Sequence, residues 1–289
     1  MFVSIIIPTY NAQKEITKLL QQIRRQSLVD FELIVIDSTS EDLTVEKARE
    51  YADRVEVIPK EEFRHGGTRT KAAKLARGEL LVFMTQDVLL YDDSSIEKLI
   101  AVFEDERVGA AYGRQLPHLG EKPFGAHLRH FNYGELSYKR IYDDKHQFGI
   151  KTAFLSDSFA AYRRDALEKI GWFKMELNFG EDMYAGAKLL KEGFSLAYVA
   201  EAMVYHSHSY RLKEEYRRYY ETGKFHQQEA WLIEEFGKPE GEGLRFVKSE
   251  WKYLLKRGYY YLLPLSLIRN MIKLLGYKMG KFSTEIQGR

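Results

Sequence analysis

Strand-length apolar runs alternate with amphipathic stretches through the first third of the chain, and this alternation constrains the fold more than any other feature. The runs are Val3–Ile7, Leu33–Ile36, Val55–Ile58 and Leu80–Met84, and the stretches with helical spacing are Gln13–Gln26, Thr44–Tyr51, Thr68–Ala76 and Ser94–Phe103. Repeated βα units predict an α/β fold with a Rossmann-like, mostly parallel sheet flanked by helices. Ligands bind such sheets beyond the carboxyl ends of the strands, so functional residues are expected directly after each run.

The pattern loosens between Asp105 and Tyr205. Leu116–Phe131 predicts a loop, and short elements are expected around Phe154–Tyr162, Asp165–Ile170 and Asp182–Glu192. After His206 the chain is rich in Tyr, Arg and Lys and predicts helices, with a linker at Gly237–Gly243 that contains Pro239. We therefore predict one domain over residues 1–205, in halves 1–104 and 105–205, followed by a C-terminal helical extension over residues 206–289.

Composition excludes several classes of function. The chain has no cysteine, which excludes disulfides, thiolate zinc sites and a cysteine nucleophile and fits a cytoplasmic location. A formal net charge of +2 shows no large excess of basic residues of the kind that binds nucleic acid, so no nucleic-acid partner is expected. No apolar run approaches the roughly 18 residues that a membrane span needs. The opening run is soon broken by Pro8 and is too short for a signal peptide.

Asp37 ends the second run and precedes small hydroxyl residues, where a carboxylate can accept hydrogen bonds from a ribose or a base edge. The alternative is a helix cap at Ser40 or Asp42, and the two interpretations are compatible. After the first run, residues 8–11 read Pro-Thr-Tyr-Asn, where a dinucleotide-binding oxidoreductase would carry G-x-G-x-x-G. That class of enzyme is therefore excluded.

Two further segments suit a diphosphate and its cation. Asp87 follows the fourth run abruptly, and a carboxylate there can hold a divalent cation that is bound mainly through phosphate oxygens. The diglycine Gly66-Gly67 would let the backbone approach a diphosphate, with Arg69 supplying a charge-assisted hydrogen bond. The alternatives are a cap at Asp87 and a glycine turn before a helix.

Carboxylates and imidazoles cluster later in the chain. Glu181 and Asp182 precede an amphipathic stretch, so they fall at a helix N-terminus, where the macrodipole favours the charged form that a general base needs. A purely structural first-turn pair is the alternative. His206 and His208 alternate along a strand-like segment, so at most one of them is expected to reach a given metal ion.

Taken together, these residues resemble the family 2 glycosyltransferases, which are inverting enzymes of GT-A fold, and more narrowly the bacterial rhamnosyltransferases. The general family pattern appears as IIIPTYNA at residues 5–12, VIDSTSEDLT at 35–44, Gly-Glu-Asp at 180–182 and the late His206. The narrower pattern appears as FRHGGTR at 63–69, TQD at 85–87, AYGRQLP at 111–117 and VYHSH at 204–208.

The resemblance implies a role for each matching residue. Asp182 would be the catalytic base, and Asp87 and His206 would be ligands of a divalent cation, Mg²⁺ or Mn²⁺. The nucleotide-sugar donor would be bound within residues 1–104, by Pro8, Thr9, Tyr10, Asp37, His65, Gly66, Arg69, Thr85, Gln86 and Asp87. Thr85 departs from the family pattern, because it replaces the first carboxylate of Asp-x-Asp with a neutral hydroxyl and so makes metal dependence less certain.

The implied reaction is a single in-line displacement that moves L-rhamnose from dTDP-L-rhamnose to a saccharide or lipid-linked saccharide in cell-surface polysaccharide synthesis. One base suffices, because the diphosphate leaves as an anion. Acceptor-side candidates are Arg114, Gln115, Asp157, Trp172 and Glu181. One alternative is the transfer of a hexose or N-acetylhexosamine. Another is a non-catalytic scaffold, which would be expected to lose residues such as Asp87, Asp182 or His206.

The C-terminal region mixes basic, aromatic and leucine residues. From Trp251 onward the cations Lys252, Lys256, Arg257, Arg269, Lys273, Lys278, Lys281 and Arg289 face one acid, Glu285. Tyr259-Tyr260-Tyr261 and Leu262-Leu263 add the apolar part of an interfacial helix. We predict peripheral contact with the inner face of the cell membrane, and the alternative is a helix that packs its leucines on the catalytic domain.

Overall fold

The computed structural model describes residues 1–238 and 241–283, which build a nine-stranded sheet and the helices around it. The strand order is β3-β2-β1-β4-β8-β6-β9-β5, and β7 pairs with β9 beside this path. The strands are β1 Val3–Thr9, β2 Phe31–Asp37, β3 Arg54–Val57, β4 Leu80–Met84, β5 Leu89–Leu90, β6 Val108–Leu116, β7 Tyr138–Arg140, β8 Phe159–Arg163 and β9 Ser195–Tyr205.

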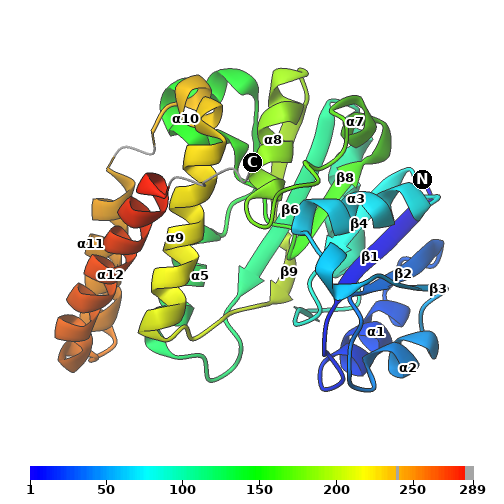
Figure 1. Cartoon of the computed structure of the whole chain (residues 1–289), viewed down its shortest axis with the longest axis horizontal. Helices are drawn as coiled ribbons and strands as arrows, with labels where there is room; N and C mark the ends of the chain where they lie inside the picture. The colour runs from blue at the N-terminus through cyan, green and yellow to red at the C-terminus, as the bar shows by residue number, and fades with distance from the viewer. Residues whose placement is uncertain (239–240, 284–289) are drawn as a thin grey trace.

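The α-helices lie on both faces of the sheet and at one end of the molecule. They are α1 Ile16–Arg24, α2 Thr44–Arg49, α3 His65–Leu75, α4 Ser95–Ile100, α5 Pro123–Asn132, α6 Lys145–Phe148, α7 Arg164–Lys169, α8 Glu181–Lys191, α9 Leu212–Gln228, α10 Ala230–Phe236, α11 Glu242–Lys256 and α12 Leu263–Phe282. In Figure 1 the first strands and the last helices lie at opposite ends of the long axis, with β6 and β9 between them.

The first four strands confirm the predicted βα alternation. β1 lies between β2 and β4 and is parallel to both, and β3 is parallel to β2. Because alternate residues of a strand face opposite sides, Ile5 packs in one apolar core with Leu19 of α1, whereas Ile6 packs in the other with Phe83 and Ala72. Burial on both faces explains why these runs are apolar throughout.

The second half of the sheet is mixed. β8 inserts between β4 and β6 and is antiparallel to both, whereas β6 and β9 are parallel. The loop predicted at Leu116–Phe131 is wrong in part, because Pro123–Asn132 forms α5. Proline at the first turn suits a helix start. The helical period is obscured because α5 buries His127 and Arg129 as well as Ala126.

The C-terminal region is helical, as predicted. A Cβ on Gly223 of α9 would lie 2.1 Å from the Tyr277 carbonyl oxygen, and one on Gly280 of α12 would lie 2.0 Å from the Tyr220 carbonyl oxygen. These glycines therefore allow the two helices to pack at close range. The predicted linker is right only in part, because Gly237 follows α10 but α11 already begins at Glu242 and includes Gly243. Pro239 lies outside the described residues. Within residues 1–238 and 241–283, no helix combines the length and apolar character that crossing a bilayer requires.

Candidate active site

A cavity of about 620 Å³ lies where β4, β6 and β9 end. Thr85 and Asp87 line it from the segment after β4, Gln115 from β6, and His206 from the residue after β9. The N-terminus of α8 and one face of α9 complete the wall. The sheet thus brings together polar residues far apart in the sequence, and the C-terminal helices share this cavity with the sheet.

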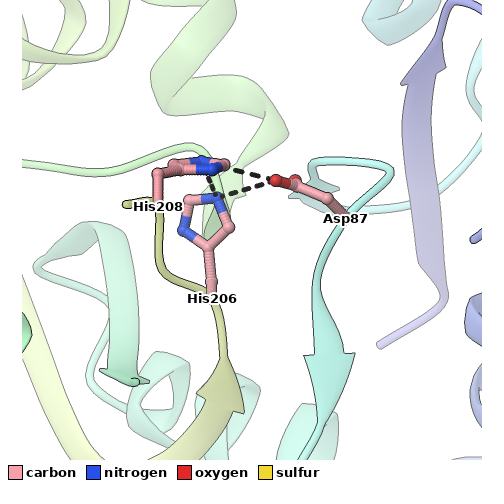
Figure 2. Close-up of side chains that lie close together, drawn as sticks. All are labelled: Asp87, His206 and His208. Carbon is pink, nitrogen blue, oxygen red and sulfur yellow. Dashed lines mark hydrogen bonds and ion pairs between the residues drawn. The ribbon is translucent and has the colours of Figure 1, made fainter. Parts of the chain in front are cut away.

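Asp87, His206 and His208 form a cluster at one side of the cavity (Figure 2). The Nε2 atoms of His206 and His208 each lie 3.4 Å from Asp87 Oδ2 and 3.1 Å from each other. The prediction that at most one histidine would reach the site is wrong. β9 ends at Tyr205, and the chain beyond it is no longer a strand, so the alternation of side chains ends there too.

Gln115 fixes the orientation of His206. Its Oε1 atom accepts a hydrogen bond from Arg129 and lies 2.9 Å from His206 Nδ1, while its Nε2 donates to the Ser156 hydroxyl over 2.8 Å. Because Oε1 can only accept, Nδ1 of His206 carries the proton, which leaves Nε2 free as a ligand facing Asp87. Gln115 was predicted on the acceptor side, and the structure places it behind the metal-ligand candidate instead.

The electrostatics of the cluster favour metal binding. Burial raises the pKa of Asp87, but interactions with His206, a hydrogen bond with Thr85 and the nearby His208 together outweigh burial and hold this pKa below the usual carboxyl range. Burial, together with the charge of His206, lowers the pKa of His208 to about 4. The cluster therefore offers an ionised carboxylate and a neutral imidazole at neutral pH, which are the forms that bind metal ions.

Asp182 lies on another side of the cavity, in the first turn of α8. Its Oδ1 accepts the backbone N–H of Met183 at 2.8 Å, and its Oδ2 that of Asp157 at 3.4 Å. Burial raises the pKa of Asp182, and the charge of Glu181 raises it further. The helix N-terminus was expected to favour the ionised form, but burial and the neighbouring charge outweigh it.

Arg69 balances the carboxylates beside Asp182. Its Nε lies 3.0 Å from Asp157 Oδ2 and its Nη1 lies 2.9 Å from Glu181 Oε1, and all three side chains are buried. Burial nevertheless raises the pKa of Asp157, and Asp182 and Glu181 raise it further. Asp157 and Glu181, two acceptor-side candidates, both line the cavity. In this structure each forms an ion pair with Arg69, and their contact with an acceptor stays a prediction. Contact between Arg69 and a donor diphosphate stays a prediction.

The residues predicted to bind the nucleoside lie at the ends of β1 and β2. Asp37 is fully buried and accepts hydrogen bonds from Thr9 Oγ1 at 2.8 Å and from the Ser40 backbone and hydroxyl at 2.7 and 2.6 Å. Pro8 precedes Thr9 and pairs with Ile36. Asp37 therefore organises the loop before α2, while its contact with a nucleoside stays a prediction.

Asp42 and Gln86 organise the next segments. Asp42 accepts the Thr44 backbone N–H at 3.0 Å from just before α2, but the N-cap position is Leu43, so neither Ser40 nor Asp42 is the predicted helix cap. The Gln86 side chain clamps the backbone of Tyr10, accepting its N–H at 2.8 Å and donating to its carbonyl at 3.2 Å. The ends of β1 and β4 are thereby tied together.

His65 and Gly66 belong to the first turn of α3 rather than to a loop. His65 lines the cavity. Burial and the charge of Arg69 together lower its pKa to about 4. A Cβ on Gly66 would lie 1.9 Å from the Lys174 carbonyl oxygen. The close approach of α3 to the backbone at Lys174 therefore explains why position 66 is a glycine.

Two acceptor-side candidates lie away from the cavity lining. Trp172 has a φ of +67° and follows α7, where the Arg164 guanidinium lies 5.9 Å from its ring centre. Arg114 pairs with Glu135 at 3.2 Å. Neither residue lines the cavity in this structure, so their acceptor contacts stay predictions.

Sequence reasoning missed His208 as a ligand candidate and the whole face of α9. The sequence did carry a signal for His208, since it stands beside His206 in the segment 204–208. It carried a weaker one for α9, where Tyr219, Thr222 and His226 recur at helical spacing.

Comparison with known proteins identifies the family to which this chain belongs. The family model for glycosyl transferase family 2 matches residues 4–171. An O-antigen chain rhamnosyltransferase of Salmonella typhimurium is 42% identical over 283 residues, covering 97% of this chain and 90% of that protein. Its counterpart in Salmonella anatum is 41% identical over 280 residues, covering 96% and 89%.

A solved structure shares the fold. A mannosyltransferase from Pyrobaculum calidifontis, in complex with GDP-Man and Mn²⁺, superposes with a TM-score of 0.69 at 18% identity, over 96% of this chain and 86% of that one. The family match covers more than half of the chain, and the Salmonella relatives align with nearly all of it. The chain therefore belongs to glycosyltransferase family 2 and is a glycosyltransferase.

Proposed function

We propose that the protein is an inverting rhamnosyltransferase that moves L-rhamnose from dTDP-L-rhamnose to a saccharide acceptor in cell-surface polysaccharide synthesis. The observation that carries the proposal is that one cavity holds both the Asp182 carboxylate and the cluster of Asp87, His206 and His208. The choice of rhamnose is supported by the two Salmonella O-antigen rhamnosyltransferases, which align with nearly the whole chain.

Asp182 is the proposed base. An acceptor hydroxyl gives its proton to the carboxylate as its oxygen attacks the anomeric carbon, and the bond between that carbon and the diphosphate oxygen breaks on the opposite face. A base works best when its pKa lies near the working pH, so the raised pKa of Asp182 suits this role. The backbone donors at Met183 and Asp157 hold the carboxylate in place.

Asp87, His206 and His208 fit a divalent cation. Their ligand atoms lie within 4.8 Å of one another, and Gln115 already orients one imidazole. Two imidazoles favour a transition metal over Mg²⁺, and the mannosyltransferase that shares this fold was solved with Mn²⁺, so Mn²⁺ is the proposed ion. A bound cation would neutralise charge on the leaving diphosphate. His208 then supplies a ligand in place of the carboxylate that Thr85 lacks.

Nucleotide-sugar screening tests the donor assignment. With Mn²⁺ present, dTDP-L-rhamnose should raise the melting temperature more than UDP-hexoses, UDP-N-acetylhexosamines or GDP-mannose do, because binding to the native state stabilises it. It should also be hydrolysed slowly without acceptor. Stronger stabilisation and hydrolysis with another sugar would replace rhamnose and keep the enzyme class, whereas hydrolysis of none would favour a scaffold.

We further propose that the acceptor is lipid-linked and that α12 rests on the inner face of the cell membrane. The buried positions of α12 are Ser266, Arg269, Lys273, Gly276 and Gly280. Its apolar residues instead face outward, with Leu267, Ile268, Met271, Leu274, Leu275 and Phe282 exposed by 49% to 79%. A helix that buries its polar face and exposes its leucines is the reverse of a helix packed on a soluble core.

Charge and aromatic residues around the outer face of α12 favour an anionic bilayer as its partner. Exposed Lys278 and Lys281 lie on α12, and exposed Lys252, Lys256 and Arg257 lie at the end of α11, which lies beside it in Figure 1. Tyr260 and Tyr261 are exposed between the two helices. The protein should sediment with anionic liposomes at low salt and be partly released as salt rises. Equal binding to neutral and anionic vesicles, or none to either, would contradict this proposal.

A further inference from the structure

The segment that carries both histidines of the cluster lies beyond the end of β9. Residues 206–211 form neither a helix nor a strand, although the chain on either side is β9 and α9. The His206 backbone N–H still donates to the Leu116 carbonyl on β6 at 2.9 Å, which extends the pairing of the two strands by one residue. Beyond that bond the sheet no longer fixes the chain, so other contacts must hold His208 where it faces Asp87 (Figure 2).

Glu121 supplies such contacts from the loop between β6 and α5. Its Oε2 atom accepts a hydrogen bond from the Ser207 hydroxyl, and its Oε1 atom accepts one from the Ser209 hydroxyl. The Ser207 hydroxyl also accepts the His118 backbone N–H, at 3.0 Å. The two serines stand on either side of His208 in the sequence. A single carboxylate therefore holds the chain immediately before and immediately after this histidine.

The Glu121 side chain is ionised at neutral pH. Burial raises the pKa of Glu121, but hydrogen bonds from Ser207, Ser209 and the Lys122 backbone together outweigh burial and lower it. An ionised carboxylate can only accept hydrogen bonds, so both serine hydroxyls donate to it. Hydrogen bonds to a charged group are stronger than those between neutral groups, which suits Glu121 to fix an irregular segment.

The start of α5 packs against the same arrangement. A Cβ on Gly125 would lie 2.6 Å from Glu121 Oε1 and 2.9 Å from the His208 carbonyl oxygen. Only a glycine at this position lets α5 lie against both groups at once. The same helix also supports His206, because Arg129 donates to the glutamine that orients this imidazole. Both histidines are therefore held from the side of β6 and α5.

We propose that Glu121 is a positioning residue for the cluster, which holds residues 207–209 so that His208 faces Asp87. Glu121 does not line the cavity, so it acts through the histidine segment rather than by contact with donor or acceptor. Partners of this kind orient metal-binding histidines and raise metal affinity. The inference rests on the proposed function, because it takes the cluster to be a cation site, and it adds a residue outside the sequence motifs.

Metal affinity gives the test. Glu121→Ala removes both serine contacts and should lower Mn²⁺ affinity, measured by calorimetry, roughly tenfold, at the lower end of the usual effect of such partners. Glu121→Gln keeps one acceptor oxygen and should recover part of this loss. The Mn²⁺ concentration that gives half-maximal transfer should rise by the same factor, while kcat at saturating Mn²⁺ stays close to that of the wild type. A residue that only stabilises the fold would leave the Mn²⁺ affinity of the folded protein unchanged.

Further variants separate Glu121 from its neighbours. The double variant Ser207→Ala, Ser209→Ala removes the same hydrogen bonds from the other side and should reproduce the loss, which covers the case in which Glu121→Ala melts early. On a His208→Ala background, Glu121→Ala should cause little further loss, because Glu121 acts mainly through this histidine. Glu106→Ala removes an exposed glutamate just before β6 and should leave Mn²⁺ affinity at the wild-type value.

The outcomes distinguish the role of Glu121 from the cation site itself. Wild-type Mn²⁺ affinity in both Glu121→Ala and the double serine variant would overturn the positioning role, and so would an undiminished further loss on the His208→Ala background. Either result would leave the cation site of the wild-type protein in place. Absence of Mn²⁺ binding to the wild-type protein would instead contradict the proposed cation site, and the inference would fall with it.

Discussion

Two aspartates of the cavity, Asp87 and Asp182, differ in the sign of their pKa shifts. Asp87 has a lowered pKa because His206, Thr85 and His208 together outweigh the effect of burial, whereas Asp182 has a raised pKa because burial and Glu181 act together. Both are aspartates in one cavity, so the difference arises from their neighbours rather than from their chemistry. One side is arranged to stay charged and hold a cation, and the other to take up a proton.

The largest effect should come from removing the proton acceptor. Asp182→Asn should lower transfer by roughly two to four decades, because an amide cannot serve as a general base. Donor binding, followed by thermal shift with dTDP-L-rhamnose, should stay close to that of the wild type. Transfer at nearly the wild-type rate would remove Asp182 from this role.

Changes on the cation side should weaken binding first. Asp87→Ala, His206→Ala and His208→Ala should each lower Mn²⁺ affinity roughly 10- to 100-fold, as measured by calorimetry. Because the three side chains share one proposed ion, double variants should lose much less than the sum of the single losses. Additive losses, or wild-type activity after chelation, would mean that these residues do not hold a common catalytic cation.

The pH profile should sharpen the contrast between the two aspartates. A base must be deprotonated before it acts, so a raised pKa at Asp182 predicts that kcat/KM falls as pH drops below neutrality, by about tenfold per unit below that pKa. Asp87 stays ionised throughout this range because its pKa is lowered. The small residual activity of Asp182→Asn should lack this acid limb. The same limb in that variant would assign the titration to another group.

The smallest effect on chemistry should come from the outer face of α12. Replacing exposed Leu274 and Leu275 together by glutamine should reduce sedimentation with anionic liposomes, because both side chains face away from the fold. Transfer to a soluble acceptor should change by less than about twofold, since surface substitutions usually alter stability by under about 0.5 kcal/mol. Unchanged vesicle binding would point to a different partner for this face.

The sequence located the candidate metal ligands that depend on strand ends. Asp87 and His206 follow strands, and apolar runs locate strands well. It failed for His208 because strand alternation was extended beyond Tyr205, where β9 ends. It also did not show that Trp172 lies away from the cavity lining, since nothing in a local pattern tells which neighbouring element a side chain will face.

The C-terminal helices show a second limit of sequence reasoning. The basic and aromatic composition of α11 and α12 was apparent, but which face of α12 is buried depends on α9 and on the glycines that let the two helices approach. The same tertiary packing turns one face of α9 toward the catalytic cavity. Donor-half residues could therefore be named by motif, and their roles stay predictions, whereas the face of α9 became apparent only from the fold.

The configuration of the product tests the central claim most directly. Incubation with dTDP-L-rhamnose, Mn²⁺ and an oligosaccharide acceptor, followed by NMR of the purified product, reports the anomeric configuration of the new linkage. A single displacement assisted by Asp182 predicts rhamnose joined with the configuration opposite to that in the donor. A product that retains the donor configuration, or an acceptor that gains no rhamnose while another nucleotide sugar is transferred, would contradict the account.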